Sequence, residues 1–109
     1  MIYKYKNAPK RNVGDNMIIT DVFAEKEKDM DFVIGELDGF HGTFINEKNT
    51  KYYYILNGKA MVTINGEKDE VEEGDFVEIP INAKHSIEGK VKFAIMCTPP
   101  FDIHSEKII

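Results

Sequence analysis

The chain has 109 residues, of which 42% are apolar and 11% are aromatic, and its formal net charge is -5. This length suits one hydrophobic core, so we expect a single domain over residues 1–109, with its core between about 17 and 101. An acidic chain without a basic block lacks the surface that binds phosphate backbones, which argues against nucleic acid as a general partner. The apolar runs are shorter than the roughly 20 residues of a membrane-spanning helix, so we expect no membrane partner.

The N-terminal segment and the single cysteine indicate the compartment. Residues 1–11 carry several charges and lack the uninterrupted apolar stretch of a signal peptide. Cys97 has no second cysteine to pair with, which excludes an intrachain disulfide and a thiolate cluster. It lies within the apolar run VKFAIMC, which predicts a buried, unreactive thiol. We therefore expect a cytoplasmic protein.

Short runs of β-branched and aromatic residues alternate with Gly, Asn, Asp and Pro along the chain, a pattern typical of an all-β sandwich or barrel. In chain order, the predicted strands are Ile2–Tyr5, Met17–Phe23, Phe32–Leu37, His41–Asn46, Lys51–Leu56, Ala60–Ile64, Phe76–Ile79, His85–Ile87 and Val91–Cys97. No segment predicts a helix, and we expect residues 102–109 to form a terminal turn or to fray.

Three dipeptides predict the tight turns between these strands. Asp38-Gly39 ends one strand, while Asn57-Gly58 and Asn65-Gly66 supply the positive φ angles that two-residue hairpins need. The acidic stretch 68–73 connects the second hairpin to the strand that begins at Phe76. Pro99-Pro100 ends the last strand, because proline cannot donate a hydrogen bond to a neighbouring strand.

From Gly74 onward the sequence resembles the second motif of the cupin superfamily. That motif has a Gly, five residues, a Pro and then a His, which correspond here to Gly74, Pro80 and His85. Asn82 stands where the motif has a further Gly, and Asn tolerates the same left-handed conformation. The resemblance extends over about residues 32–102 and implies a small single-domain cupin, an all-β double-stranded β-helix or jelly-roll barrel.

The first cupin motif keeps its spacing but loses its metal ligands. Counting back from Gly58, the position of the metal-binding Glu holds Lys51, and the two His positions hold Phe44 and Asn46. Of the four usual ligands only His85 remains, and a cationic lysine repels a divalent ion. We therefore expect no metal cofactor.

The other two histidines are expected at the surface. His41 lies an odd number of residues from the two lost His positions, so on a regular strand its side chain points away from them. A bulge at Gly42 would turn it inward and, together with His85, would make an atypical metal site the alternative. His104 lies in the tail that follows the barrel.

The resemblance places a mixed set of apolar and polar side chains in the barrel interior. These are Phe44, Asn46, Lys51, Tyr53, Ile55 and His85. Such mixtures line small-molecule sites, and a lysine in an apolar cavity is expected to have a lowered pKa. Our main hypothesis is that Phe44, Asn46, Lys51, Tyr53 and His85 bind a small anionic or sugar-like molecule.

Two other interpretations of this interior stay open. His85 as base, with Tyr53 or Lys51 as acid, would suit a metal-free sugar isomerase or epimerase. Alternatively, the three side chains form a hydrogen-bonded network that closes the barrel and binds nothing.

The opposite face of the strand 51–56 carries Tyr52, Tyr54 and Leu56. An outward apolar row on a central strand indicates cover by another chain or by the N-terminal segment. We expect a homodimer, with a partly exposed aromatic patch as the alternative.

Overall fold

The computed structural model describes residues 1–25 and 27–109, and this part of the chain contains strands and two short 3-10 turns but no α-helix. The strands are β1 (Lys10–Val13), β2 (Met17–Phe23), β3 (Asp31–Asn46), β4 (Thr50–Ile64), β5 (Glu67–Glu72), β6 (Phe76–Ile79), β7 (His85–Thr98) and β8 (Glu106–Ile108). The turns are η1 (Tyr5–Asn7) and η2 (Ile103–Ser105). The all-β prediction is confirmed. Among the described residues, none belongs to a helix that is long and apolar enough to cross a membrane.

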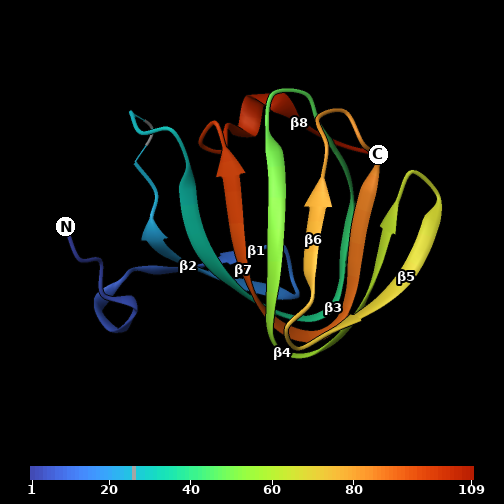
Figure 1. The fold of residues 1–109 in the computed structure, drawn as a ribbon, viewed down its shortest axis with the longest axis horizontal. Coiled ribbons are helices and arrows are strands. Elements are labelled where there is room, and N and C mark those ends of the chain that lie inside the picture. The colour runs from blue at the N-terminus through green and yellow to red at the C-terminus, as the bar shows by residue number, and fades with distance from the viewer. Residues whose placement is uncertain (26) are drawn as a thin grey trace.

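The strands pair in the order β1-β2-β3-β7-β4-β5, while β6 adds to β4 and β8 adds to β3. All these pairings are antiparallel. Figure 1 shows the long strands β3, β4 and β7 curving together at one end of the molecule, so that the sheet folds over on itself. The enclosed core includes the fully buried side chains of Ile55, Ile79 and Phe93.

The sheet bends where β4 and β7 run together, and this bend depends on close contact between the two strands at two glycines. Gly58 in β4 has φ +86, and a Cβ there would lie 2.2 Å from the backbone oxygen of Lys90. Gly89 in β7 has φ +150, and a Cβ there would lie 2.5 Å from the backbone oxygen of Lys59. Each glycine therefore lets the opposite backbone approach more closely than any side chain would allow.

Two of the three predicted turns are wrong, for a common reason. Asp38-Gly39 and Asn57-Gly58 lie inside β3 and β4, which pair with β7 on both sides of each dipeptide. A left-handed glycine that is flanked by continuous pairing bends a strand instead of reversing it. The hairpin at Asn65-Gly66 is confirmed, with φ angles of 49 and 84 and with Ile64 opposite Glu67.

Three strands also differ from the prediction. The strand predicted at residues 2–5 is wrong, and the first strand is β1, which pairs with β2. The acidic stretch forms the edge strand β5, which the sequence did not predict because carboxylates are rare in strands. Its charges face solvent at a free edge, where they discourage further strand pairing. The two strands predicted within residues 85–97 are one strand, β7.

We predict that Gly58→Ala destabilises the protein far more than Gly66→Ala does. Gly66 has nearly the same φ, +84, but a Cβ there meets no atom within 4 Å. Both variants incur backbone strain of about 1–3 kcal/mol, whereas Gly58→Ala also forces β4 away from β7. The free energy of unfolding, measured by urea denaturation, should fall by about 2 kcal/mol more for Gly58→Ala. Equal losses would show that the close contact between the strands is unimportant.

Candidate functional site

A cavity of about 750 Å³ opens beside the inner face of the folded sheet. Its lining includes His41 from β3, Lys51 from β4 and Glu106 from β8. Aromatic side chains also line it, namely Tyr3, Phe23 and Phe101, together with the ion-paired Arg11 and Asp21, which are 2.8 Å apart. Apolar walls with a few convergent polar groups are typical of small-molecule sites.

Lys51 and Glu106 form the more deeply buried of the two ion pairs in this cavity. The Nζ atom of Lys51 lies 2.7 Å from Oε2 of Glu106, and the two side chains are only 12% and 14% exposed. The ammonium group also lies 5.6 Å from the ring centroid of Phe101 and 6.0 Å from that of Phe44. Such a pair is poorly solvated, so its charges interact strongly with each other and with a ligand in the cavity.

The pKa of Lys51 is raised, and the predicted lowering is wrong. Burial alone lowers this pKa, but Tyr53 and the hydrogen-bonded carboxylate of Glu106 outweigh that effect. Burial raises the pKa of Tyr53, so this neighbour stays neutral at neutral pH and the carboxylate is the effective partner. Lys51 is therefore a cation at neutral pH.

Glu106 reaches Lys51 because the C-terminal segment folds back over the barrel, across the top of Figure 1. The strand β8 pairs with β3, where Glu106 lies opposite Asn46. The loop between β7 and η2 is held by the buried Asn49, whose Nδ2 donates to the backbone oxygens of Pro99 and Pro100. Ser105 donates to Oδ1 of Asn49 over 3.2 Å, which completes the attachment. The sequence predicted a turn or a frayed end here, and so it missed Glu106.

His41 points into the cavity because β3 contains a bulge. The pairing of β3 with β7 shifts register between Phe40 and Thr43, and Gly42 within this interval has φ +116. The His41 ring packs 4.9 Å from the ring of Phe44. Burial and the charge of Lys51 lower the pKa of His41, so it is a neutral imidazole at neutral pH. The expected surface position is wrong for His41, and the bulge gives the reason, whereas His104 is exposed.

His85 is more deeply buried, at 2% exposure, and does not line the cavity. Its Nδ1 lies 2.9 Å from the backbone oxygen of Ala83. A carbonyl only accepts, so Nδ1 carries the proton and Nε2 is left with a lone pair. That Nε2 has no hydrogen-bond partner among the described residues. Burial and the charge of Lys51 lower the pKa of His85, which is therefore also neutral at neutral pH.

Two other predicted site residues, Asn46 and Tyr53, make their contacts within the barrel wall and core. Asn46 is buried, and its Oδ1 accepts the backbone N–H groups of Lys48 and Asn49. Tyr53 packs edge-on against Phe93 in the core, with ring centroids 5.0 Å apart. Neither Asn46 nor Tyr53 lines the cavity. Cys97 does line it, but the thiol is buried, and burial and Asp31 raise its pKa to about 12, so it is not a nucleophile at neutral pH.

The donors at the positions of the cupin metal ligands do not fit a divalent ion. The Oδ1 atom of Asn46 is committed to two backbone donors, and Lys51 is a cation. Among the described residues, no three His, Cys, Asp or Glu side chains converge on one point. A cation about 4 Å from an ammonium meets roughly 4 kcal/mol of repulsion per unit charge at an effective dielectric constant of 20, which doubles for a divalent ion.

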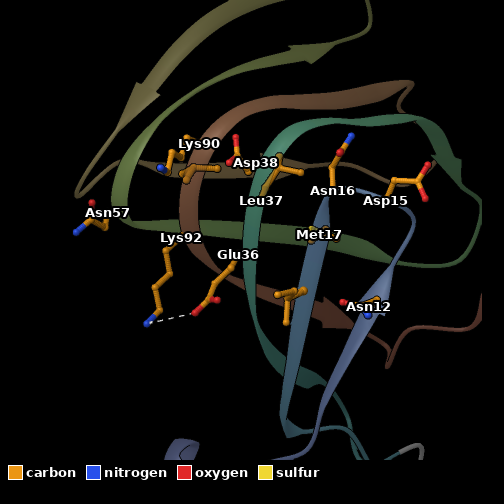
Figure 2. A pocket seen from close by; sticks show the side chains of 12 residues that line it. Asn12, Asp15, Asn16, Met17, Glu36, Leu37, Asp38, Asn57, Lys90 and Lys92 are labelled. Atoms are coloured by element: carbon orange, nitrogen blue, oxygen red, sulfur yellow. Dashed lines mark ion pairs between the residues drawn. The ribbon is translucent and has the colours of Figure 1, made fainter.

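A second hollow, of about 640 Å³, lies where the β1–β2 turn meets β3 and β7 (Figure 2). Its lining includes Asn16, Asp38 and Lys90, and the ion pair of Lys92 with Glu36 spans 3.8 Å. Both members of that pair are 40% exposed, so water screens them. This hollow lacks the desolvated charges of the first cavity, which makes the first cavity the candidate site.

Comparisons with known proteins identify relatives of this barrel. The family model described as "Cupin domain" matches residues 38–98. An uncharacterized protein of Methanocaldococcus jannaschii is 39% identical over an alignment of 61 residues, and the match covers 52% of this chain and 49% of that protein. Quercetin 2,3-dioxygenase of Bacillus subtilis is 29% identical over an alignment of 82 residues, and the match covers 67% of this chain and 24% of that protein. The chain thus spans about half of the first relative and a quarter of the second.

A solved structure matches the whole chain. The nucleoside dehydratase Pac13 has a TM-score of 0.90 and 17% sequence identity, and the match covers 100% of this chain and 90% of that one. A Streptomyces form of Pac13 with uridine gives the same TM-score. The double-stranded β-helix, jelly-roll fold that the resemblance to cupins implied is confirmed.

Proposed function

We propose that this chain, a member of the cupin family, binds a small hydroxyl-bearing or anionic molecule in its cavity through Lys51, Glu106 and His41. The observation that carries the proposal is the ion pair of Lys51 with Glu106, 2.7 Å long and at most 14% exposed, in the lining of a cavity large enough for a ligand. An ammonium has three donors, of which Glu106 accepts one, and a carboxylate has further acceptor sites.

The cavity lining favours a ligand with a polar part and a flat or apolar part. Lys51 and Glu106 complement an oxygen acceptor and a hydroxyl donor that are close together, as in sugars and hydroxy acids. The aromatic side chains of Tyr3, Phe23 and Phe101 offer surfaces on which a ring can pack. A form of Pac13, which shares the fold, is described with uridine. Nucleosides therefore join sugars, sugar phosphates and carboxylates in the panel to be tested.

We predict that a ligand from this panel raises the melting temperature of the wild-type protein but binds Lys51→Met much more weakly. At a concentration a hundred times the dissociation constant, a ligand adds about 2.7 kcal/mol of stability. Losing a charged hydrogen bond should weaken binding by roughly 10- to 100-fold. Thermal shift and calorimetry measure both effects. The control is Lys92→Met, which removes a lysine outside this cavity and should leave affinity unchanged. Ligands that bind Lys51→Met normally would place the site elsewhere.

A second candidate function is proton transfer, and it is favoured by the environment of His41. This imidazole lines the same cavity as Lys51, and its lowered pKa keeps it neutral at neutral pH. A neutral imidazole can take a proton from carbon while a nearby ammonium stabilises the developing oxyanion. The base would then be His41, because His85 and Tyr53 do not line the cavity.

We predict that a sugar or nucleoside bound in the cavity exchanges a carbon-bound proton with solvent deuterium, and that His41→Gln slows this exchange by about 10²- to 10⁴-fold. The ordinary pKa of His is about 6.5 and that of His41 is lower, so exchange should persist at pH 6.5 and decline as more acidic solution protonates the base. Proton NMR in deuterium oxide measures the rate. His104→Gln, at an exposed site, is the control. Binding without exchange would leave the protein a binding module.

The outer face of the sheet supports the expected homodimer. Tyr54 and Phe76 are 42% and 61% exposed, and Phe76 stacks on Tyr52 with ring centroids 5.6 Å apart. The N-terminal segment covers a different part of this face, where the hydroxyl of Tyr5 donates to Glu36. An exposed aromatic patch on a rigid sheet suits a second copy of the chain.

We predict that the wild-type protein sediments as a dimer and that Tyr54→Glu combined with Phe76→Glu sediments as a monomer. Two carboxylates buried at the contact would lack partners, which disfavours association by several kcal/mol. Analytical ultracentrifugation between micromolar and millimolar concentrations measures the mass. The control is Ile81→Glu, at a 47% exposed apolar residue of a loop. A wild-type monomer throughout this range would refute the homodimer.

A further inference from the structure

The interior of the barrel holds a cation of its own, the ammonium group of Lys51. It lies on the inner face of β4, opposite Cys97 of β7, and is fixed by Glu106 at 2.7 Å. The ring centroids of Phe44 and Phe101 lie within 6.0 Å of it, and the Lys51 side chain is only 12% exposed. This charge is built into the fold, because the contacts that hold it come from β3, β8 and the loop before η2.

Two neutral imidazoles lie near this ammonium. His41 lines the same cavity, and His85 is buried with an unpartnered Nε2 lone pair. The ring of Phe44 connects the three groups: its centroid lies 4.9 Å from that of His41, 6.4 Å from that of His85 and 6.0 Å from the ammonium of Lys51. In keeping with this arrangement, the positive charge of Lys51 contributes, after burial, to lowering the pKa of both rings. Among the described residues, Glu106 and the two imidazoles do not converge closely enough to hold a metal ion by themselves, so the ammonium of Lys51 is the positive centre of this part of the interior.

We infer that the ammonium of Lys51 takes the place of a divalent ion in this barrel and supplies the positive charge that holds a carbonyl or carboxylate oxygen of the ligand. Glu106 accepts one of its hydrogens, and the others are available to the cavity. The ligand part of this inference rests on the proposed function. The replacement of the ion by the ammonium does not rest on the proposed function, and a metal-binding experiment tests it separately.

The experiment reverses the replacement by changing Lys51→Glu. This variant exchanges the cation for a carboxylate in the neighbourhood of His41, His85 and Glu106. After incubation with Co²⁺ and desalting, the wild-type protein should retain less than about a tenth of an ion per chain, and Lys51→Glu about one. Elemental analysis gives the ratio, and visible absorption reports the coordination of Co²⁺. Adding His85→Ala to Lys51→Glu should abolish retention.

A matched control places the same charge change elsewhere. Lys92→Glu, on the solvent side of β7, adds a carboxylate outside the cavity and should retain no more Co²⁺ than the wild-type protein. If Lys51→Glu is unfolded when purified, Co²⁺ should restore its far-ultraviolet circular dichroism, because metal binding then drives folding.

Three results would overturn the inference. One is a wild-type protein that retains about one Co²⁺ per chain and loses it with His85→Ala. Another is a folded Lys51→Glu variant that retains no Co²⁺. The third is an unfolded Lys51→Glu variant that Co²⁺ does not restore. A ligand panel without hits would refute the proposed function and leave these outcomes unchanged, so the two failures are distinguishable.

Discussion

The bend that β4 and β7 share at Gly58 and Gly89 is the constraint on which both the barrel and its interior site depend. Along this antiparallel pair, Lys51 lies opposite Cys97 and Ile64 lies opposite His85. In a flat ribbon, residues 51 and 64 would be roughly 43 Å apart at about 3.3 Å per residue, more than the 38 Å length of the whole molecule. Folding the ribbon at the glycines brings its two ends together, so that the ring of Phe44 lies 6.0 Å from the ammonium of Lys51 and 6.4 Å from the ring of His85.

A buried charge on an inner sheet face is costly unless a partner lies within hydrogen-bond distance. The partner of Lys51 comes from the last strand of the chain, which is held in place by Asn49 and by pairing with β3. The neutral imidazoles of His41 and His85 add no further charge. The ion pair of Lys51 with Glu106 and the two imidazoles therefore add no net charge to the interior at neutral pH. An apolar replacement of the ion pair would often be as stable, so stability alone does not explain its presence.

The sequence predicted those parts of the fold that depend on local pattern. Alternation identified the buried faces of β4 and β7, and Asn65-Gly66 identified a real hairpin. The same kind of dipeptide misled at Asn57-Gly58, because a glycine with positive φ serves a tight turn and a bent strand equally well. Only the pairing of both flanks with β7 separates these cases, and that pairing is not a local property. β5 was missed because a free edge tolerates charges that a central strand does not.

For the site, motif spacing pointed to Lys51, and a possible bulge at Gly42 left an inward His41 open. It did not point to Glu106, which lies 55 residues from Lys51 and reaches it through the C-terminal segment. That omission also explains the error about charge: Lys51 alone in an apolar barrel would lose its proton more readily, whereas Lys51 beside Glu106 keeps it. The family motif thus fixes where a group lies in the barrel, while a segment outside the motif decides its protonation. In a cupin with altered ligand positions, the chemistry of the interior therefore depends on the motif residues and on the segments outside the motif that contact them.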